Sequence, residues 1–152
     1  MRLQVLGIGK IREPYYRDAA NEYLKRVRKH LAVRVLETTK EQSGRERDLD
    51  AAYRKIRREH TGADLPVALD RSGQVMSSAH LAAWLEEAMR DGVNLVSFII
   101  GGPHGLSAAA LEDSRMILSL SAMTLPHQMV RLLLMEQIYR AMSIIRGEPY
   151  HK

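Results

Sequence analysis

A proline at position 126 divides the C-terminal part of the chain into an extended apolar run and a long helix. The run at residues 118–125, LSLSAMTL, ends there because the proline ring fixes φ and biases the preceding residue towards extended geometry. Residues 127–146 then carry apolar side chains at helical spacing, at Val130, Leu133, Leu134, Ile138, Met142 and Ile145. Polar positions are so few that we expect cover on several sides of this helix, from its own domain and from a partner subunit. Glu136 and Arg140 are spaced for a helical ion pair, which we expect on the exposed strip.

The rest of the chain alternates between short apolar runs and amphipathic stretches. Runs typical of buried strands occur at residues 3–9, 33–36, 65–69, 94–100 and 116–120. Helices are predicted at residues 13–29 and 48–60, from a Ser77 or Ser78 cap to Arg90, and in a short segment capped by Ser107. We expect a mobile loop at residues 38–47 and a turn at residues 71–73. The alternation predicts a single α/β domain over the 152 residues, with a mainly parallel sheet flanked by helices.

Three of the predicted strands end in segments suited to a binding pocket. In open parallel sheets, ligands bind beyond the carboxyl ends of the strands. Leu69-Asp70, Ile100-Gly101-Gly102 and the run 120–125 occupy such ends, so we expect them to converge on one pocket. The GIGK segment after the first strand lacks the spacing and the ending of a phosphate loop, and no GxGxxG motif follows that strand. An ordinary dinucleotide-binding fold is therefore disfavoured.

Positive charge is concentrated in the first part of the chain. Residues 1–60 contain 16 Lys and Arg and 9 Asp and Glu, a net charge of +7, whereas residues 61–152 contain 7 and 9, a net charge of −2. Two basic clusters, at residues 25–29 and 54–58, are either solvated helix faces or a surface that faces a polyanion, for which RNA is the natural candidate. Aromatic residues make up only 5%, which argues against a stacking platform for single strands.

The composition disfavours several other classes of protein. The chain has no cysteine, so it has no disulfide framework and no thiolate nucleophile. Its histidines are scattered, and we expect no metal site. No signal peptide and no apolar run of membrane-spanning length occurs, which predicts a soluble, cytoplasmic protein without a membrane partner.

Four ordered sequence blocks carry a resemblance to a known enzyme family. They are IIGGPHGLS (99–107), LSLSAMTLPHQMVR (118–131), LLLMEQIYRA (132–141) and RGEPYHK (146–152). Together they resemble the RlmH family, small SPOUT-class methyltransferases that methylate N3 of a pseudouridine in 23S ribosomal RNA. The resemblance extends over essentially the whole chain. It implies an α/β fold with a deep C-terminal trefoil knot, and a homodimer that modifies an RNA hairpin on the assembled ribosome.

The resemblance also implies the cofactor and the residues that hold it. The methyl donor of the family is S-adenosylmethionine, bound in the knot largely by backbone groups. The matching positions in this chain are Leu69, Gly101, Leu120, Ser121, Ala122, Met123, Thr124 and Leu125. For Leu120 and Leu125, plain core packing is an equally good explanation.

Removal of the proton from the pseudouridine N3 calls for a general base or a group that favours the anionic base. The catalytic candidates are His127, Arg131, Tyr150 and His151. His127 begins the last helix, where the macrodipole favours a neutral imidazole, although a structural role as a cap or core histidine is the alternative. Arg131 is suited to hold a phosphate or a developing negative charge. By resemblance, the tail with Tyr150 and His151 completes the active site of the other subunit; a frayed terminus is the alternative.

Two further functions remain compatible with the sequence. One is a SPOUT-like methyltransferase with a different RNA target, because small members share the cofactor knot. The other is a non-catalytic module that binds RNA or a nucleotide, which would show no turnover with S-adenosylmethionine.

Overall fold

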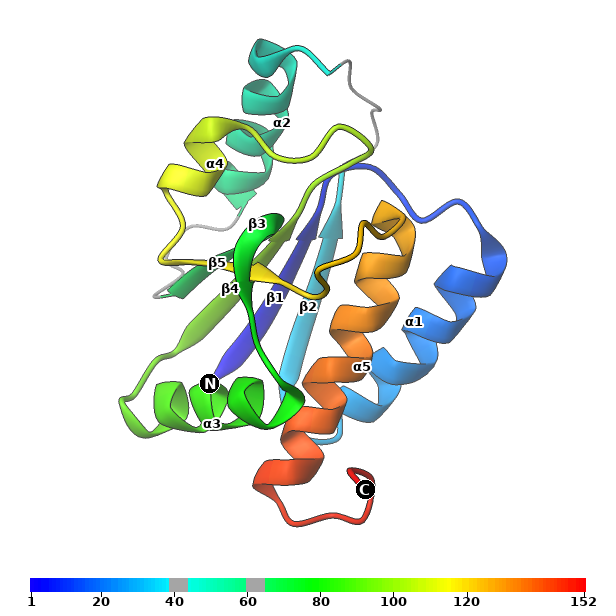
Figure 1. Ribbon diagram of the computed structural model, residues 1–152, viewed down its shortest axis with the longest axis vertical. Coiled ribbons are helices and arrows are strands. Elements are labelled where there is room, and N and C mark those ends of the chain that lie inside the picture. The colour runs from blue at the N-terminus through cyan, green and yellow to red at the C-terminus, as the bar shows by residue number, and fades with distance from the viewer. Residues whose placement is uncertain (39–43, 60–64) are drawn as a thin grey trace.

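The computed structural model describes residues 1–38, 44–59 and 65–152 (Figure 1). Within these ranges, five parallel strands form one sheet in the order β2-β1-β4-β3-β5. The strands are β1 (Arg2–Gly7), β2 (Ala32–Glu37), β3 (Leu65–Val75), β4 (Leu95–Ile100) and β5 (Met116–Ser119). The helices are α1 (Pro14–Val27), α2 (Glu46–Glu59), α3 (Ser78–Arg90), α4 (Ala108–Glu112) and α5 (His127–Ile145). The prediction of a mainly parallel sheet flanked by helices is confirmed.

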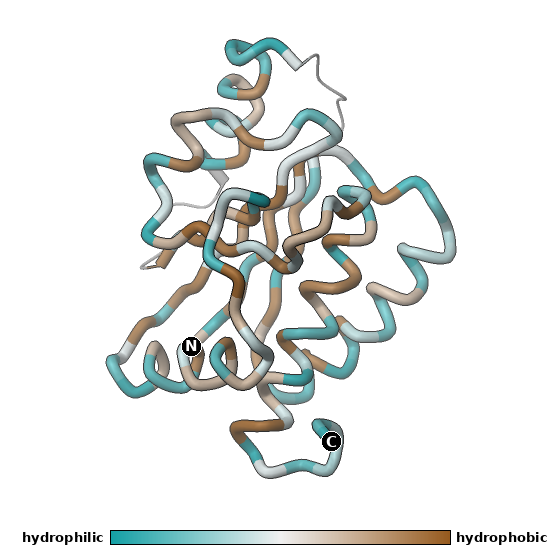
Figure 2. The backbone as a smooth tube through the Cα atoms, viewed as in Figure 1, coloured by the Kyte–Doolittle hydropathy of each residue, from teal (hydrophilic) through white to brown (hydrophobic). Residues whose placement is uncertain are grey.

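Helices cover both faces of the sheet, with α1, α3 and α5 on one side and α2 and α4 on the other (Figure 1). Successive side chains of a strand point to opposite faces, so a sheet covered on both sides needs apolar residues at nearly every position. In β1, Val5 packs into the core under α1, α3 and α5, whereas Leu6 packs with Tyr53 of α2. Figure 2 shows the resulting concentration of hydrophobic residues in the strands and along α5.

The helices begin close to the predicted signals. Ser77 caps α3 by accepting a hydrogen bond from the backbone N–H of His80 (3.1 Å), and Ser107 caps α4. Pro126 is the N-cap of α5, as its position in the sequence predicts. Helix α2 begins two residues before its predicted start. Half of the mobile loop predicted at residues 38–47, residues 39–43, lies outside the described residues, and its last two residues belong to α2.

Strand β3 continues beyond its predicted end at Leu69. Leu69 and Gln74 both pair with Leu118 of β5, so the intervening residues bulge out of the ladder. The turn predicted at residues 71–73 is therefore enclosed within one long strand, because pairing with β5 resumes after it.

The bulge in β3 is held by a short polar side chain and by a close approach of two backbones. The Asp70 Oδ1 atom accepts hydrogen bonds from the Ser72 backbone N–H (2.9 Å) and hydroxyl (2.7 Å). A Cβ atom at Gly73 would lie 2.6 Å from the carbonyl carbon of Ile117 in β5. Only glycine leaves room for this contact, which fixes the bulge against β5.

Tyr53 makes the stability of the α2 face depend on pH. Its side chain is 2% exposed, and its hydroxyl donates to Asp113 at 3.1 Å. Burial, reinforced by this carboxylate, raises the pKa of Tyr53 from 10.0 to about 12. Because the folded protein disfavours the phenolate, the stabilisation is complete below pH 10 and is lost as the pH rises through 12.

We expect the free energy of unfolding to fall between pH 10 and pH 12 by about 2 kcal/mol more in the wild type than in Tyr53→Phe. Urea unfolding at a series of pH values in this range measures the difference. Equal pH dependence in the two proteins would contradict the assignment.

Candidate functional site

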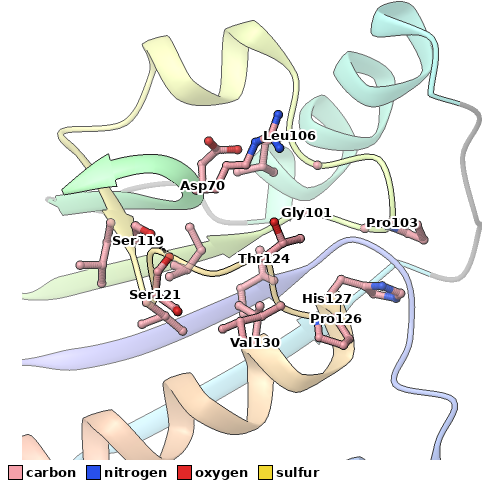
Figure 3. Close-up of a pocket in the computed structure, with 18 of the residues that line it drawn as sticks. Asp70, Gly101, Pro103, Leu106, Ser119, Ser121, Thr124, Pro126, His127 and Val130 are labelled. Atoms are coloured by element: carbon pink, nitrogen blue, oxygen red, sulfur yellow. Dashed lines mark hydrogen bonds between the residues drawn. The ribbon is translucent and has the colours of Figure 1, made fainter. Parts of the chain in front are cut away.

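A cavity of about 580 Å³ lies at the carboxyl ends of β3, β4 and β5, beside the start of α5 (Figure 3). Its walls are formed by residues 69–71, 100–106, 118–121, 123–127 and Val130. The convergence predicted for Leu69-Asp70, Ile100-Gly101-Gly102 and the run 120–125 is confirmed. Segments far apart in the sequence thus meet at one edge of the sheet, as expected for parallel strands.

The structure brings together the residues expected to hold a methyl donor, with one exception. Those that line the cavity are Leu69, Gly101, Leu120, Ser121, Met123, Thr124 and Leu125. Ala122 is exposed and does not line it. Figure 3 shows Gly101 and Thr124 within the site, with Asp70 on one side and His127 on the other.

The loop after β4 turns tightly on its glycines. Gly105 has a positive φ of 81°, and its N–H donates to the carbonyl of Gly102 at 3.0 Å. A Cβ atom at Gly101 would lie 2.5 Å from the carbonyl carbon of Gly105. The chain can fold back on itself only because Gly101 has no side chain, and this exposes backbone rather than side-chain surface to the cavity.

The loop after β5 is ordered by its own hydroxyl groups. The Ser119 hydroxyl donates to the carbonyl of Ser121 (2.8 Å), and the Ser121 hydroxyl accepts from the N–H of Met123 (2.9 Å). These bonds stiffen a segment that has no regular secondary structure. The Met123 side chain is 77% exposed, so it leaves most of its surface free for a further contact.

His127 lines the cavity from the first position of α5. The first turn of α5 is anchored to the segment before α1, because the Gln128 side-chain oxygen accepts from the N–H groups of Arg12 (2.6 Å) and Glu13 (3.0 Å). The imidazole is therefore presented by a fixed helix end, where the macrodipole disfavours a positive charge.

Arg131, one turn further along α5, does not line the cavity and is 4% exposed. Its guanidinium donates to Glu37 Oε1 (2.5 Å) at the end of β2, and to the carbonyls of Ile8 (3.1 Å) and Gly9 (2.6 Å) after β1. Burial lowers the pKa of Arg131, and the Glu37 carboxylate opposes that shift. These partners bind Nη1 and Nη2 and give Arg131 a structural role, whereas its buried Nε has no hydrogen-bond partner within the described part of the chain. The contact of Arg131 with a substrate phosphate or anionic base stays a prediction.

Neither Tyr150 nor His151 lines the cavity, and the C-terminus lies near the far end of α5 from His127 (Figure 1). The Tyr150 hydroxyl donates to Glu136 at 3.1 Å and lies 3.2 Å from the hydroxyl of Tyr23. The Glu136–Arg140 ion pair forms at 2.6 Å as predicted, but its side chains are only 14% and 25% exposed. The expectation of an exposed surface pair was wrong, because the tail folds over it.

Several lining residues were missed by the assignment of site residues from the sequence. They are Asp70, Arg71, Ile100, residues 102–106, Leu118, Ser119, Pro126 and Val130. Most of them are next to an assigned residue in the sequence. Their position at the end of a predicted strand is therefore the feature that could have identified them. Asp70 was recognised as part of such an end but was not assigned a role, since one carboxylate after a strand has no specific spacing.

Among the described residues, no group of three or more His, Cys, Asp and Glu is placed to hold a metal ion. None of the helices in the same ranges is long and apolar enough to cross a membrane.

We expect Arg131→Met to lower the free energy of unfolding by about 2–3 kcal/mol, since it leaves two carbonyls and a half-buried carboxylate without their cation. Arg17→Met is the matched control, because its ion pair with Asp18 lies at the surface, with side chains that are 53% and 70% exposed. Chemical denaturation of both variants measures the effect. Similar losses in the two would show that Arg131 contributes no more than a surface arginine.

Comparison with known proteins identifies relatives that span the whole chain. The family model described as "Predicted SPOUT methyltransferase" matches residues 1–151. A protein of Moorella thermoacetica named ribosomal RNA large subunit methyltransferase H is 40% identical over 159 residues, which cover 100% of this chain and 99% of the relative. A protein of the same name from Syntrophomonas wolfei is 36% identical, with 100% of both chains covered.

The fold also matches a solved structure. The crystal structure of a probable methyltransferase from Bordetella pertussis superposes with a TM-score of 0.62 over 93% of this chain and 96% of that chain, at 14% identity. This likeness shows a shared fold. On the family match and the full-length identity together, the chain belongs to the SPOUT methyltransferases and, within them, to the RlmH family.

Proposed function

We propose that the protein transfers a methyl group from S-adenosylmethionine to N3 of a pseudouridine in 23S ribosomal RNA. The observation that carries this proposal is the cavity at three converging strand ends. The relatives support the substrate class, since they are named ribosomal RNA large subunit methyltransferase H.

The walls of the cavity fit S-adenosylmethionine, which supplies an activated methyl group on its sulfonium when it is bound. The volume of about 580 Å³ lies in the range of roughly 300–1,000 Å³ typical of small-molecule sites. Leu69, Leu120 and Leu125 offer apolar surface to the faces of a purine. The loops after β4 and β5 offer backbone N–H and C=O groups to its edge, and a neutral base needs such groups rather than charges. We therefore assign donor binding to the lining residues of the expected set and leave out Ala122.

We assign removal of the N3 proton to His127. His127 lines the cavity at the start of α5, where the macrodipole favours the neutral form that accepts a proton. Gln128 fixes this turn against the segment before α1, and Arg131 fixes it against the ends of β1 and β2. Fixed placement matters because in-line transfer depends on alignment of the reacting atoms. Arg131 acts here through the position of the helix.

We assign Tyr150 and His151 to the active site of a second copy of the chain. Neither residue lines its own cavity, and the C-terminus lies near the far end of α5, so their contact with the target nucleotide requires a homodimer. The apolar surround of α5 supports this, since Leu132 and Leu133 are only half-buried in the single chain.

The proposal includes a trefoil knot formed by the C-terminal segments. Close approaches of backbone at Gly73 and Gly101 support it, because a chain that passes through a loop leaves little space for side chains. We place the target in a hairpin of the assembled ribosome, where a looped-out base can be reached. The basic residues 1–60 support binding to RNA, and a ribosomal substrate implies the cytoplasm.

The test is incubation of the protein with labelled S-adenosylmethionine and ribosomes that lack the modification, followed by nucleoside analysis. We expect label in N3-methylpseudouridine of 23S ribosomal RNA. Gly101→Ala is the control, because its Cβ would displace the loop after β4, and we expect at least about a tenfold loss of transfer. Label in another nucleoside would overturn the proposed target, and absence of label would overturn the activity. Efficient modification of a short naked hairpin would contradict the need for a ribosome.

Deletion of residues 147–152 tests the role of the tail. We expect transfer to fall by about a hundredfold or more, because loss of the nucleotide contact misaligns the reacting atoms, while donor affinity by titration calorimetry changes by no more than a few-fold. Full activity of the truncated protein would remove Tyr150 and His151 from the site.

A further inference from the structure

The last six residues form an ordered tail that folds back on α1 and α5. Gly147 has a positive φ of 65° and reverses the chain after α5. The N–H of Gly147 donates to the carbonyl of Ile144 (3.0 Å), and the N–H of Glu148 donates to the carbonyl of Ser143 (2.8 Å). These bonds satisfy carbonyl groups at the end of α5, and the residues that follow turn back towards α1 and α5.

Tyr150 attaches the tail to both α1 and α5 through its side chain. Its hydroxyl donates to Glu136 (3.1 Å) on α5 and lies 3.2 Å from the hydroxyl of Tyr23 on α1. Its ring packs edge-on against Tyr139, with ring centroids 4.7 Å apart, and the Arg140 guanidinium lies 4.7 Å from its centroid. Two helices and two kinds of contact therefore hold one side chain.

The surroundings of the Tyr150 hydroxyl favour its protonated, hydrogen-bond-donating form. Burial, followed by the hydrogen bond with Tyr23 and the charge of Glu136, raises the pKa of Tyr150, so the hydroxyl keeps its proton. Glu136 also accepts from Arg140 Nε (3.0 Å) and Nη2 (2.6 Å), which offsets the negative charge beneath the tail. Arg140 Nη1 in turn lies 3.4 Å from His151 Nδ1.

We infer that Tyr23 and Glu136 are positioning residues for methyl transfer, which hold the tail in a fixed shape through the hydroxyl of Tyr150. The inference rests on the proposed function, in which the tail completes the site of a second copy. A tail that is already ordered loses less conformational entropy when it meets the partner's cavity and the target nucleotide. His151 is exposed beyond this attachment, so the network sets the direction in which its imidazole is presented.

The test uses Tyr23→Phe, which removes one hydroxyl and keeps the ring between Arg26 and Tyr139. Tyr15→Phe is the matched control on the same helix, since the Tyr15 side chain is 63% exposed. Glu136→Ala is a second variant that removes the shared acceptor. Amide hydrogen exchange of residues 147–152 by mass spectrometry reports the order of the tail without any reaction. For each variant, turnover with ribosomes measures kcat, and calorimetric titration with S-adenosylmethionine measures donor affinity.

In Tyr23→Phe we expect roughly three- to tenfold faster exchange of the tail and a similar fall in kcat, the ratio that corresponds to one net hydrogen bond. Donor affinity should stay within about twofold, and Tyr15→Phe should match the wild type in all three measurements. Glu136→Ala should show faster tail exchange and a larger fall in kcat than Tyr23→Phe, because it removes the shared acceptor. Unchanged tail exchange in Tyr23→Phe, or faster exchange with unchanged kcat, would overturn the inference. The role of the tail in the proposed function is tested separately by the deletion of residues 147–152. Full activity of the truncated protein would overturn that role, whatever the result with Tyr23→Phe.

Discussion

A buried guanidinium in the last helix binds the end of β2 and the segment that follows β1, beside the pocket. Arg131 of α5 binds Glu37 at the end of β2 and two carbonyls that follow β1. A buried charge is costly unless all its partners are in place, so a shift of α5 along the sheet would leave a cation unpaired. The same helix turn carries His127 and Val130 in the wall of the cavity. The shape of the site therefore depends on an interaction that lies outside it, and Gly7 makes room for it.

Most of the fold could be predicted because it is encoded locally. Apolar runs, the Ser77 and Ser107 caps and the proline before α5 each act within a few residues of themselves. The position of the pocket could also be predicted, because parallel strands place their carboxyl ends at one edge. The continuation of β3 beyond Leu69 could not, since it depends on pairing with β5 and on a bulge stabilised by a single aspartate side chain.

The roles of individual side chains were harder to predict than the location of the site. Arg131 has the charge and spacing of a substrate-binding residue, yet its partner Glu37 is 94 positions away and nothing local signals that pairing. The Glu136–Arg140 pair was predicted from its helical spacing, but its burial depends on a tail that folds back over it. In both cases, long-range contacts determine whether a charged residue faces solvent, substrate or the interior of the protein.

Helix α5 lies between the cavity and the C-terminal tail, the two regions to which we assign roles in the proposed reaction. Its 19 residues span about 28 Å at the standard rise of 1.5 Å per residue, with the cavity at one end and the tail at the other. If two copies form a closed pair, the twofold rotation that delivers one terminus to the opposite cavity also delivers the second. Such a pair would contain two equivalent composite centres on separate faces, whereas a single hairpin could occupy only one of them at a time. The separation of cavity and tail along one helix would thus give each enzyme pair two sites, of which one hairpin fills one.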